Sequence, residues 1–293
     1  MNIIQKNRPI TPADIECLKY FTRIVGLKVH AIEFTWQDSS HSYYALLQDV
    51  IRGNLADSSE FKARLNRSWI NLDKYFTVFI ISGRQGLLRY HQLCRIEDEL
   101  SDVFTQGKSV IASRTLVIFV NHNGELNEQR IARLVNYATD RNLAIGMSES
   151  RTDECSLRTL YEQAQLALRV QKRAFPDRHI IRFDECRSYY LYDLCSRQPH
   201  WEYYLHDYML MLRDHDEGCP LPLLPTLCCL VRHHGNRTAA SKELGIQRNS
   251  LQYRLGKIEE ICSIDLANPD VFDDVAFSVR LCDYCMNGKE ATV

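Results

Sequence analysis

The sequence predicts an α+β protein in which a sheet backed by helices is followed by an all-α domain. Strand-like and helix-like segments alternate between Tyr75 and Phe183, in the order β-α-β-β-α-β-α-β. After Leu221 the composition shifts to short helices separated by tight turns, which indicates a separate module. The length of 293 residues suits two or three modules that each bury a core.

The strands of the first module are predicted from apolar runs rich in β-branched and aromatic residues. These runs are YFTVFII, TLVIFV, LAIGM and HIIRF. Residues 109–121 are expected to form two strands around a tight turn at Ser113-Arg114, which makes a hairpin. Apolar residues at helical spacing predict helices at 88–104, 127–141 and 156–174.

The segments that flank this module are also predicted to be helical. Residues 43–67 have helical spacing ahead of a turn at Gly53-Asn54, and we interpret them as a connector. A single helix is expected over residues 201–212, because its aromatic and apolar residues form one stripe. The members of that stripe are Trp201, Tyr204, Leu205, Tyr208 and Leu212.

Composition restricts the function classes. The net charge is −1, so any nucleic-acid binding has to come from a local basic face. No run of signal-peptide type or of membrane-spanning length is present, which predicts a cytoplasmic protein with no membrane partner. The eleven cysteines are odd in number and scattered, as expected for reduced thiols in the cytoplasm.

The C-terminal segment has the order of a helix-turn-helix. One helix is stopped by Gly235, a short helix covers 238–244, and a turn at Gly245-Ile246-Gln247 leads into a helix over 248–261. Asn236 or Thr238 is expected to cap the short helix. The second helix of such a motif places its N-terminal part in the major groove of DNA, so 248–257 is the predicted recognition helix.

The predicted recognition helix separates an apolar stripe from a polar face. Its apolar residues are Leu251, Leu255, Ile258 and Ile261. Between Leu221 and Asp265 six Arg or Lys face four Asp or Glu, a local balance of +2. The candidate DNA-binding residues are Asn236, Arg237, Thr238, Gln247, Arg248, Asn249, Ser250, Gln252, Tyr253, Arg254 and Lys257.

These candidates divide into two expected roles. Arg248, Asn249, Ser250 and Gln252 are predicted to read bases, since Arg can pair with guanine and Gln with adenine through two hydrogen bonds. Arg237, Arg254 and Lys257 are better placed for phosphates.

The segment GNRTAASKELGIQRNSLQYRLGKIEE resembles the DNA-binding domain of PucR/CdaR-type transcription regulators and, more distantly, Fis-type helix-turn-helices. The resemblance continues through IDLANPDVFDDVAFSVRL, which in that family forms a further helix. The middle segments GMSESRTDECSLRTLYEQAQLALRV and IIRFDEC resemble the family's GGDEF-related domain, and LLQDVIRGNLADSSEFKARL resembles the segment before it. The resemblance covers residues 43–285 in all.

The resemblance implies a degenerate nucleotide-cyclase-like (ferredoxin-like) sheet domain ahead of the helix-turn-helix domain. It also implies control of a metabolic operon, in response to an effector that the sequence does not identify. We expect a homodimer, because one helix-turn-helix reads only a short half-site. The first 40 residues leave no room for the family's large N-terminal sensor domain. We therefore expect an N-terminal remnant and connector at 1–72, the sheet domain at 73–195, a linker helix at 196–219 and the DNA-binding domain at 220–293.

Two positions depart from the family pattern. Gly256 stands where such helices usually carry a basic residue, and Gln252 replaces a usual Arg. Both changes are expected to weaken nonspecific DNA affinity and to alter the preferred sequence. Gly256 and the near-neutral net charge are the best argument for an alternative, an interaction protein that does not bind DNA.

A second alternative is an enzyme or nucleotide-binding protein built on the cyclase-like domain. An active cyclase needs a hairpin with glycines beside the phosphates and carboxylates that hold magnesium, whereas the turn here reads Ala112-Ser113-Arg114-Thr115. We therefore expect no catalytic residues, no cofactor and no metal, and interpret the domain as one used for dimerisation or signal transfer.

Three other patterns have structural interpretations. Cys282-x-x-Cys285 and Cys228-Cys229 are expected to be buried thiols, not a zinc or redox site. His233-His234 is interpreted as a cap at a helix C-terminus, where imidazole can meet the free carbonyls. The aromatic residues of 201–212 are expected to form a packed connector, with a ligand pocket as the alternative.

Overall fold

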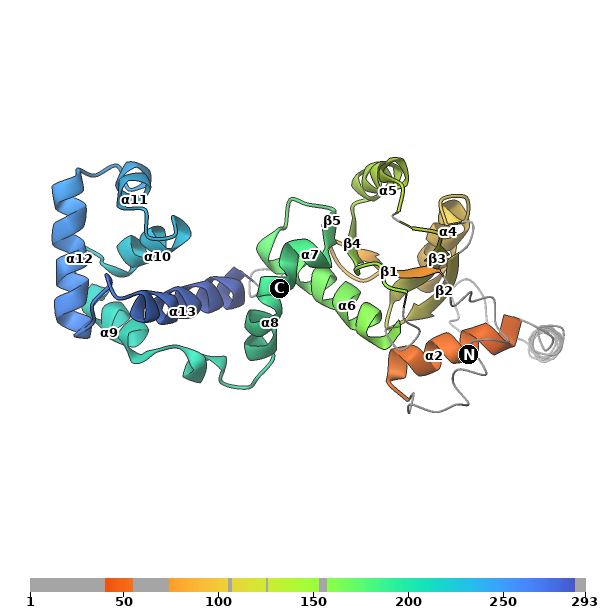
Figure 1. Cartoon of the computed structure of the whole chain (residues 1–293), viewed down its shortest axis with the longest axis horizontal. Helices are drawn as coiled ribbons and strands as arrows, with labels where there is room; N and C mark the ends of the chain where they lie inside the picture. The colour runs from red at the N-terminus through yellow and green to blue at the C-terminus, as the bar shows by residue number, and fades with distance from the viewer. Residues whose placement is uncertain (1–39, 55–73, 105–106, 125, 153–156, 288–293) are drawn as a thin grey trace, which may run out of the picture.

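The structure, a computed structural model, describes residues 40–54, 74–104, 107–124, 126–152 and 157–287. It contains a sheet domain and a helical domain, which Figure 1 shows as two lobes. The sheet domain contains the strands β1 (Tyr75–Gly83), β2 (Gly107–Ala112), β3 (Thr115–His122), β4 (Leu143–Met147) and β5 (Ile180–Arg182). Its helices are α2 (Ser40–Arg52), α4 (Tyr90–Leu100), α5 (Glu128–Asp140) and α6 (Leu157–Ala174).

The five strands form one mixed sheet in the order β2-β3-β1-β4-β5. β1 is central and pairs antiparallel with both β3 and β4, while β5 runs parallel to β4. The first four strands with α4 and α5 make the split β-α-β-β-α-β arrangement of ferredoxin-like domains. The predicted α+β class and the predicted order of elements are therefore confirmed.

Helices cover both faces of the sheet. Phe76, Val78 and Ile80 of β1 pack against α2 and α6, whereas Phe79 and Ile81 pack against α4 and α5. Side chains alternate between the faces of a strand, so a strand buried on both faces needs apolar residues at every position. This is why YFTVFII is almost wholly apolar, and its buried Thr77 has a partner in His122.

The hairpin between β2 and β3 has the two-residue turn that the sequence predicts. Ser113 and Arg114 both have a positive φ, 48° and 62°, which is the backbone of a type I′ turn. The helix predicted over 43–67 is shorter in the structure, because α2 ends at Arg52 and Gly53 turns with φ 73°. The remainder of that prediction, 55–67, lies outside the described residues.

Short helices connect the sheet domain to the helical domain. They are α7 (Phe183–Cys186), η2 (Arg187–Tyr189), α8 (Tyr190–Ser196) and η3 (Trp201–Tyr204). The prediction of one helix over 201–212 is wrong, because Leu205 is extended and a new helix begins after His206. Only the second half of the predicted stripe is core: Tyr208 and Leu212 are buried, whereas Tyr204 is exposed.

The described residues of the helical domain form five helices. They are α9 (Asp207–Asp216), α10 (Leu224–Arg232), α11 (Arg237–Glu243), α12 (Arg248–Cys262) and α13 (Pro269–Asn287). Their inner faces share one apolar core that includes Tyr208, Leu227, Leu251, Leu255 and Val275. Within the described residues, no helix is both long enough and apolar enough to cross a bilayer.

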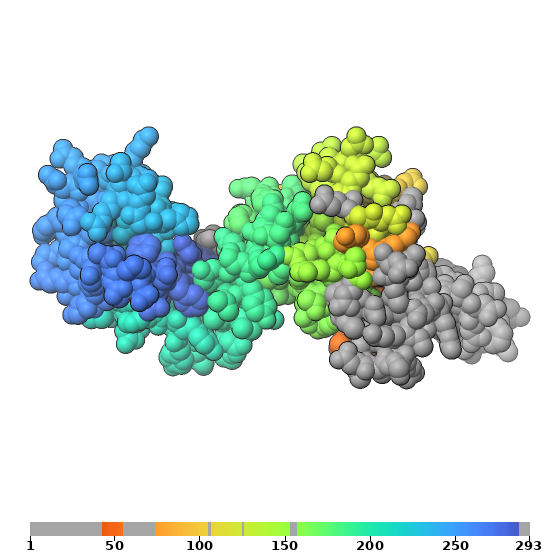
Figure 2. Space-filling model, in the orientation of Figure 1, coloured from red at the N-terminus to blue at the C-terminus, as the bar shows by residue number. Residues whose placement is uncertain are grey.

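The C-terminal half of α13 leaves the helical domain and packs against the sheet domain, as Figure 1 shows. The buried carboxylate of Asp193, on α8, lies at the centre of this contact. It accepts two hydrogen bonds from Arg169 of α6, at 2.9 and 2.8 Å, and one from the Tyr284 hydroxyl of α13, at 3.1 Å. Figure 2 shows the two lobes joined across this narrower middle.

Candidate nucleic-acid interface

The helices α10, α11 and α12 form the predicted helix-turn-helix region. Between α10 and α11 the chain turns at His234 and Gly235, with φ of 50° and 79°. Of the two capping residues that the sequence allowed, Asn236 takes the role: its Oδ1 accepts hydrogen bonds from the amides of Thr238 and Ala239, both at 3.1 Å. This cap satisfies the free amides at the start of α11.

The N-terminus of α12 has no such cap. Gln247 is the N-cap residue with extended backbone, and its side chain makes no capping hydrogen bond. The first amides of a helix have no partner within the helix, and its dipole favours negative charge at this end. The start of α12 is therefore open to a phosphate, unlike the start of α11.

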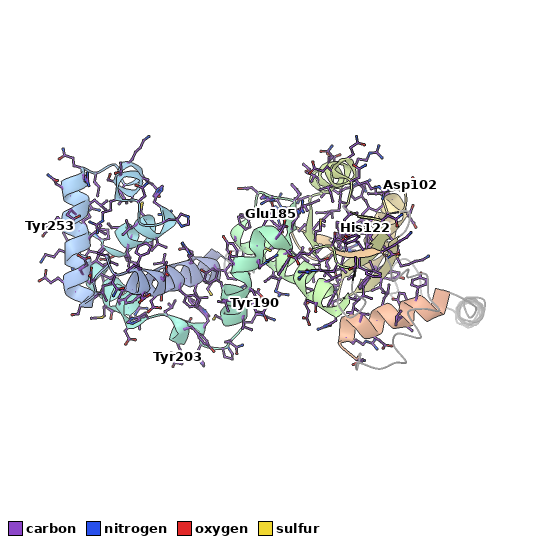
Figure 3. All side chains as sticks on the ribbon, viewed as in Figure 1. Asp102, His122, Glu185, Tyr190, Tyr203 and Tyr253 are labelled. Atoms are coloured by element: carbon purple, nitrogen blue, oxygen red, sulfur yellow. The ribbon has the colours of Figure 1, made fainter. Side chains whose placement is uncertain are left out.

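One face of α12 is buried and the opposite face is exposed. Leu251, Leu255 and Ile258 are buried as predicted, but in the last turn Cys262 is buried and Ile261 is only half-buried. The exposed candidates on or beside α12 are Gln247, Arg248, Asn249, Ser250, Gln252 and Tyr253. Figure 3 shows Tyr253 on the outer side of α12, away from the domain core, where 61% of its surface is exposed.

Within the part of the chain that the structure describes, Arg248, Asn249 and Ser250 have no side-chain hydrogen bond or ion pair. The structure thus brings three adjacent polar side chains to the first turn of α12 and leaves them unpaired. A donor such as Arg248 and an amide such as Asn249 match the groups that base edges present in the major groove.

Arg237 and Gln252 are brought together although 15 residues separate them. The Arg237 Nη1 donates to the Gln252 Oε1 at 2.7 Å, which ties the start of α11 to the outer face of α12. The Gln252 oxygen can accept one further hydrogen bond and its amide nitrogen still has two donors, so the contact to Arg237 can hold this side chain in place while it pairs with adenine.

The two remaining cations of α12 already have partners in the protein. Arg254 is half-buried, and its Nη1 donates to the buried Thr226 of α10 at 3.4 Å, so it is turned inward from the outer face. Lys257 pairs with Glu260 at 2.6 Å, and this hydrogen bond raises the pKa of Lys257. The expected phosphate contacts of these two side chains compete with these intramolecular contacts.

Gly256 lies on the exposed side of α12. A Cβ placed there would meet no atom within 4 Å. The fold of the described residues therefore does not require glycine at this position.

The structure also brings together three residues whose proximity the sequence pattern did not predict. Cys229, His233 and Glu243 offer one Sγ, one ring nitrogen and one carboxylate oxygen that lie within 4.8 Å of one another. The imidazole of His233 contacts Glu243, and that of His234 lies 3.3 Å from the Arg280 guanidinium. The side-chain contacts expected with helix carbonyls are thus replaced by contacts across helices. The Cys-x-x-x-His spacing on a helix was the signal available in the sequence.

The other cysteine pairs lie in helices. Cys285 is buried and Cys228 is half-buried. Burial raises the pKa of Cys228 to about 12 and that of Cys285 to about 11, so both are protonated near neutral pH.

The β2–β3 hairpin of the sheet domain offers little to a nucleotide. Its turn consists of Ser113 and Arg114, and neither supplies a carboxylate for magnesium. This hairpin therefore does not carry the metal-binding groups that a cyclase reaction needs.

Family models match both regions of the chain. Residues 223–281 match the PucR C-terminal helix-turn-helix domain, and residues 52–170 match the GGDEF-like domain. These are the two domains that the sequence resemblance predicts.

Two bacterial proteins are similar to this chain. The DNA-binding transcriptional activator AdeR of Bacillus subtilis is 31% identical over 126 residues, which cover 41% of this chain and 29% of that protein. The carbohydrate diacid regulator of Escherichia coli is 30% identical over 154 residues, which cover 50% of this chain and 36% of that protein. The chain thus matches about a third of the length of each relative.

A solved structure, the regulator of polyketide synthase expression from Bifidobacterium adolescentis, aligns with 86% of this chain and 94% of its own. The sequence identity is 13% and the TM-score is 0.38.

Proposed function

Because the chain is a PucR/CdaR-type transcriptional regulator, with a GGDEF-like domain ahead of a PucR C-terminal helix-turn-helix domain, we propose that it binds double-stranded DNA sequence-specifically through the first half of α12. The observation that carries the proposal is the exposed, unpaired group Arg248, Asn249 and Ser250 at the uncapped start of this helix. The N-terminal part of a recognition helix is the part that meets base edges.

The roles of the remaining candidates follow from their contacts. Arg248 reads a base through its guanidinium, while Thr238 and the free amides at the start of α12 contact phosphates. Arg237 orients Gln252 through their hydrogen bond, and Arg254 connects α12 to α10 through its hydrogen bond to Thr226. Tyr253 and Lys257 lie on or beside the exposed face, where Lys257 has to leave Glu260 to reach a phosphate.

The protein acts as a homodimer in this proposal. A single helix-turn-helix covers only a short half-site, and two-fold symmetric operators require two copies at a fixed spacing. The sheet domain serves dimerisation or signal transfer and not catalysis, since the β2–β3 turn has no carboxylate. One relative is named a DNA-binding transcriptional activator and the other a carbohydrate diacid regulator, and these names favour a role in controlling transcription of metabolic genes.

The test is DNA binding by the purified full chain to labelled fragments of its own upstream region. Arg248→Ala is expected to weaken binding to the specific fragment about 5- to 150-fold, the effect of losing one good base contact. Arg213→Ala is the matched control, because Arg213 is an exposed arginine of α9 that pairs with its neighbour Asp214 on the same helix.

Affinity should also fall as salt is raised, because phosphate contacts release counterions. Equal loss in Arg248→Ala and Arg213→Ala would contradict the assignment of the reading residue. Binding no tighter than to random competitor DNA would favour the alternative of an interaction protein.

A further inference from the structure

A second cluster of chemically reactive side chains lies at the corner between α10 and α11, apart from the exposed face of α12. Cys229 and His233 are four residues apart at the C-terminal end of α10, so both project from the same side of that helix. Glu243 is the last residue of α11 and approaches them from the other side. Two separate helices thus supply three potential metal ligands.

The ligand atoms are already close. The His233 Nε2 and the Glu243 Oε2 are 2.6 Å apart, and the three candidate ligand atoms all lie within 4.8 Å of one another. Cys229 is buried, His233 is half-buried and Glu243 is exposed, so the cluster opens to solvent on one side. We propose that Cys229, His233 and Glu243 form a binding site for a zinc ion, with water as the fourth ligand.

The donor set selects the class of metal. One thiolate, one imidazole and one carboxylate match the ligands of zinc, whereas magnesium and calcium prefer oxygen alone. Tetrahedral zinc at its usual bond lengths holds ligand atoms about 3.3 to 3.7 Å apart. The imidazole and carboxylate have to separate by about 1 Å to admit the ion, which side-chain rotation on two helices allows.

Nearby groups decide how strongly the site binds. The Arg232 Nη2 lies 3.3 Å from the Glu243 Oε1, so one carboxylate oxygen is shared with a cation while the other faces His233. The Cys229 Sγ lies 3.6 Å from the Ala240 carbonyl. Burial, followed by the charge of Glu243, raises the pKa of Cys229, so the thiol is protonated before metal arrives.

Binding is balanced by release of that proton to solvent. The Cys229 sulfur loses a proton to solvent and forms a bond to the ion. The His233 Nε2 also gives up the proton that it shares with Glu243, which moves to Nδ1 when the ring is neutral and to solvent when the ring is an imidazolium. The freed Nε2 and the Glu243 Oε2 then each bind the ion. The affinity is therefore expected to increase with pH. The ion would connect α10 to α11 without contacting the exposed start of α12, so the site stands independently of DNA binding.

The test uses the full chain after metal removal, titrated with cobalt(II) as a spectroscopic stand-in for zinc. We expect one equivalent of cobalt to produce a thiolate charge-transfer band and the visible absorption of tetrahedral cobalt, both removed by added zinc. Cys229→Ala is expected to abolish the charge-transfer band. His233→Ala and Glu243→Gln are expected to weaken cobalt binding about tenfold or more.

The chain offers two matched controls at adjacent positions. Cys228→Ala removes a neighbouring thiol, and His234→Asn removes a neighbouring imidazole while tolerating its φ of 50°. Both should bind cobalt as the unmodified chain does. Arg232→Gln should bind several times more tightly, because it removes the cation that shares Glu243.

A chain that gives no cobalt spectrum would overturn the proposal, as would a charge-transfer band that persists in Cys229→Ala. Equal losses in the controls and in the ligand variants would also overturn it. If Cys229→Ala does not fold, Glu243→Gln decides the question, since this side chain is exposed, and unchanged cobalt affinity there would contradict the site.

Discussion

The strands of the sheet domain and the start of α12 in the helical domain place their side chains differently. In the sheet domain, β1, β3 and β4 are buried along almost their whole length, and the buried Thr77 contacts His122 at 2.9 Å. In the helical domain, α12 buries one side and leaves Arg248 and its neighbours exposed without partners. The comparison teaches that polar side chains left unpaired on a rigid helix are available for another molecule.

Two glycines show the same contrast. Gly146 in β4 lies against α6, where a Cβ would come within 2.1 Å of the Ala164 carbonyl oxygen. Gly256 in α12 has open space around the position of a Cβ. Packing inside the protein requires the first glycine, whereas the fold leaves the second position free to change.

The largest expected effect comes from the contact that joins the two domains. Asp193→Asn replaces a carboxylate that is completely buried and accepts hydrogen bonds from Arg169 and Tyr284. The amide cannot form ion pairs with Arg169 and Arg197, so charge-assisted hydrogen bonds to a buried group are lost and the free energy of unfolding should fall by about 3 kcal/mol in urea titrations.

The matched control is Asp184→Asn, whose ion pair with Arg182 is half-exposed on both sides. Loss of this exposed ion pair should lower the free energy of unfolding by less than about 1 kcal/mol. Similar losses for the two variants would mean that the Asp193 contact is no more than a surface pair, and that the domains are not joined by it.

Gly146→Ala is expected to destabilise the sheet domain by about 2 to 3 kcal/mol. The added methyl group would overlap the backbone of α6 at Ala164 and Leu168, so the helix and sheet have to move apart. The shift of the urea midpoint measures this effect. Unchanged stability would show that α6 can move away from β4 without loss of packing.

Gly256→Ala is expected to raise stability, whereas Gly146→Ala lowers it. Alanine favours a helix over glycine by about 1 kcal/mol, and no neighbour is displaced, so the helical domain should become more stable.

Gly256→Lys tests the DNA-binding surface. An added phosphate contact raises the number of counterions released on DNA binding by about one, so affinity should fall more steeply as salt is raised. An unchanged salt dependence would place this position outside the DNA contact.

The smallest effect is a pH dependence in the sheet domain. Glu99 accepts hydrogen bonds from Tyr137 at 2.6 Å and Arg95 at 2.9 Å and pairs with Arg141, and together these groups lower the pKa of Glu99 from 4.5 to about 2. A lowered pKa in the folded state contributes stability above the unfolded value, and this contribution is lost as pH falls through the folded one.

Glu99→Gln should therefore be less stable than the unmodified chain at pH 7, and the difference should shrink between pH 4.5 and pH 2. Urea titrations at pH 7, 5 and 3 measure it. A difference that stays constant over this range would show that the carboxylate contributes nothing through its charge.

Much of the architecture was predictable because local patterns and tertiary packing agree. The apolar runs of β1 and β4 predict strands buried on both faces, and the Ser113-Arg114 turn marks the hairpin. In the helical domain, Gly235 and Asn236 predict the end of one helix and the start of the next. These residues have strong local preferences that the fold does not oppose.

The prediction of a single helix over residues 201–212 is wrong because of a contact between distant parts of the chain. The spacing of Trp201, Tyr204 and Tyr208 is helical, but the chain extends at Leu205 so that Tyr208 enters the core, with its hydroxyl 3.5 Å from Ser278. Figure 3 shows Tyr203, next to Tyr204, at the outside of this bend. A contact with α13, about 70 residues away, was not available to a local pattern.

The sequence alone determined the α+β class, the order of elements, the position of the helix-turn-helix and the set of candidate DNA-binding residues. Only the tertiary structure decided that Arg254 turns toward Thr226, that Arg237 meets Gln252, and that Glu243 joins Cys229 and His233. The physical reason is distance along the chain. Helix caps and apolar periodicity act over a few residues, whereas these contacts depend on how separate helices pack.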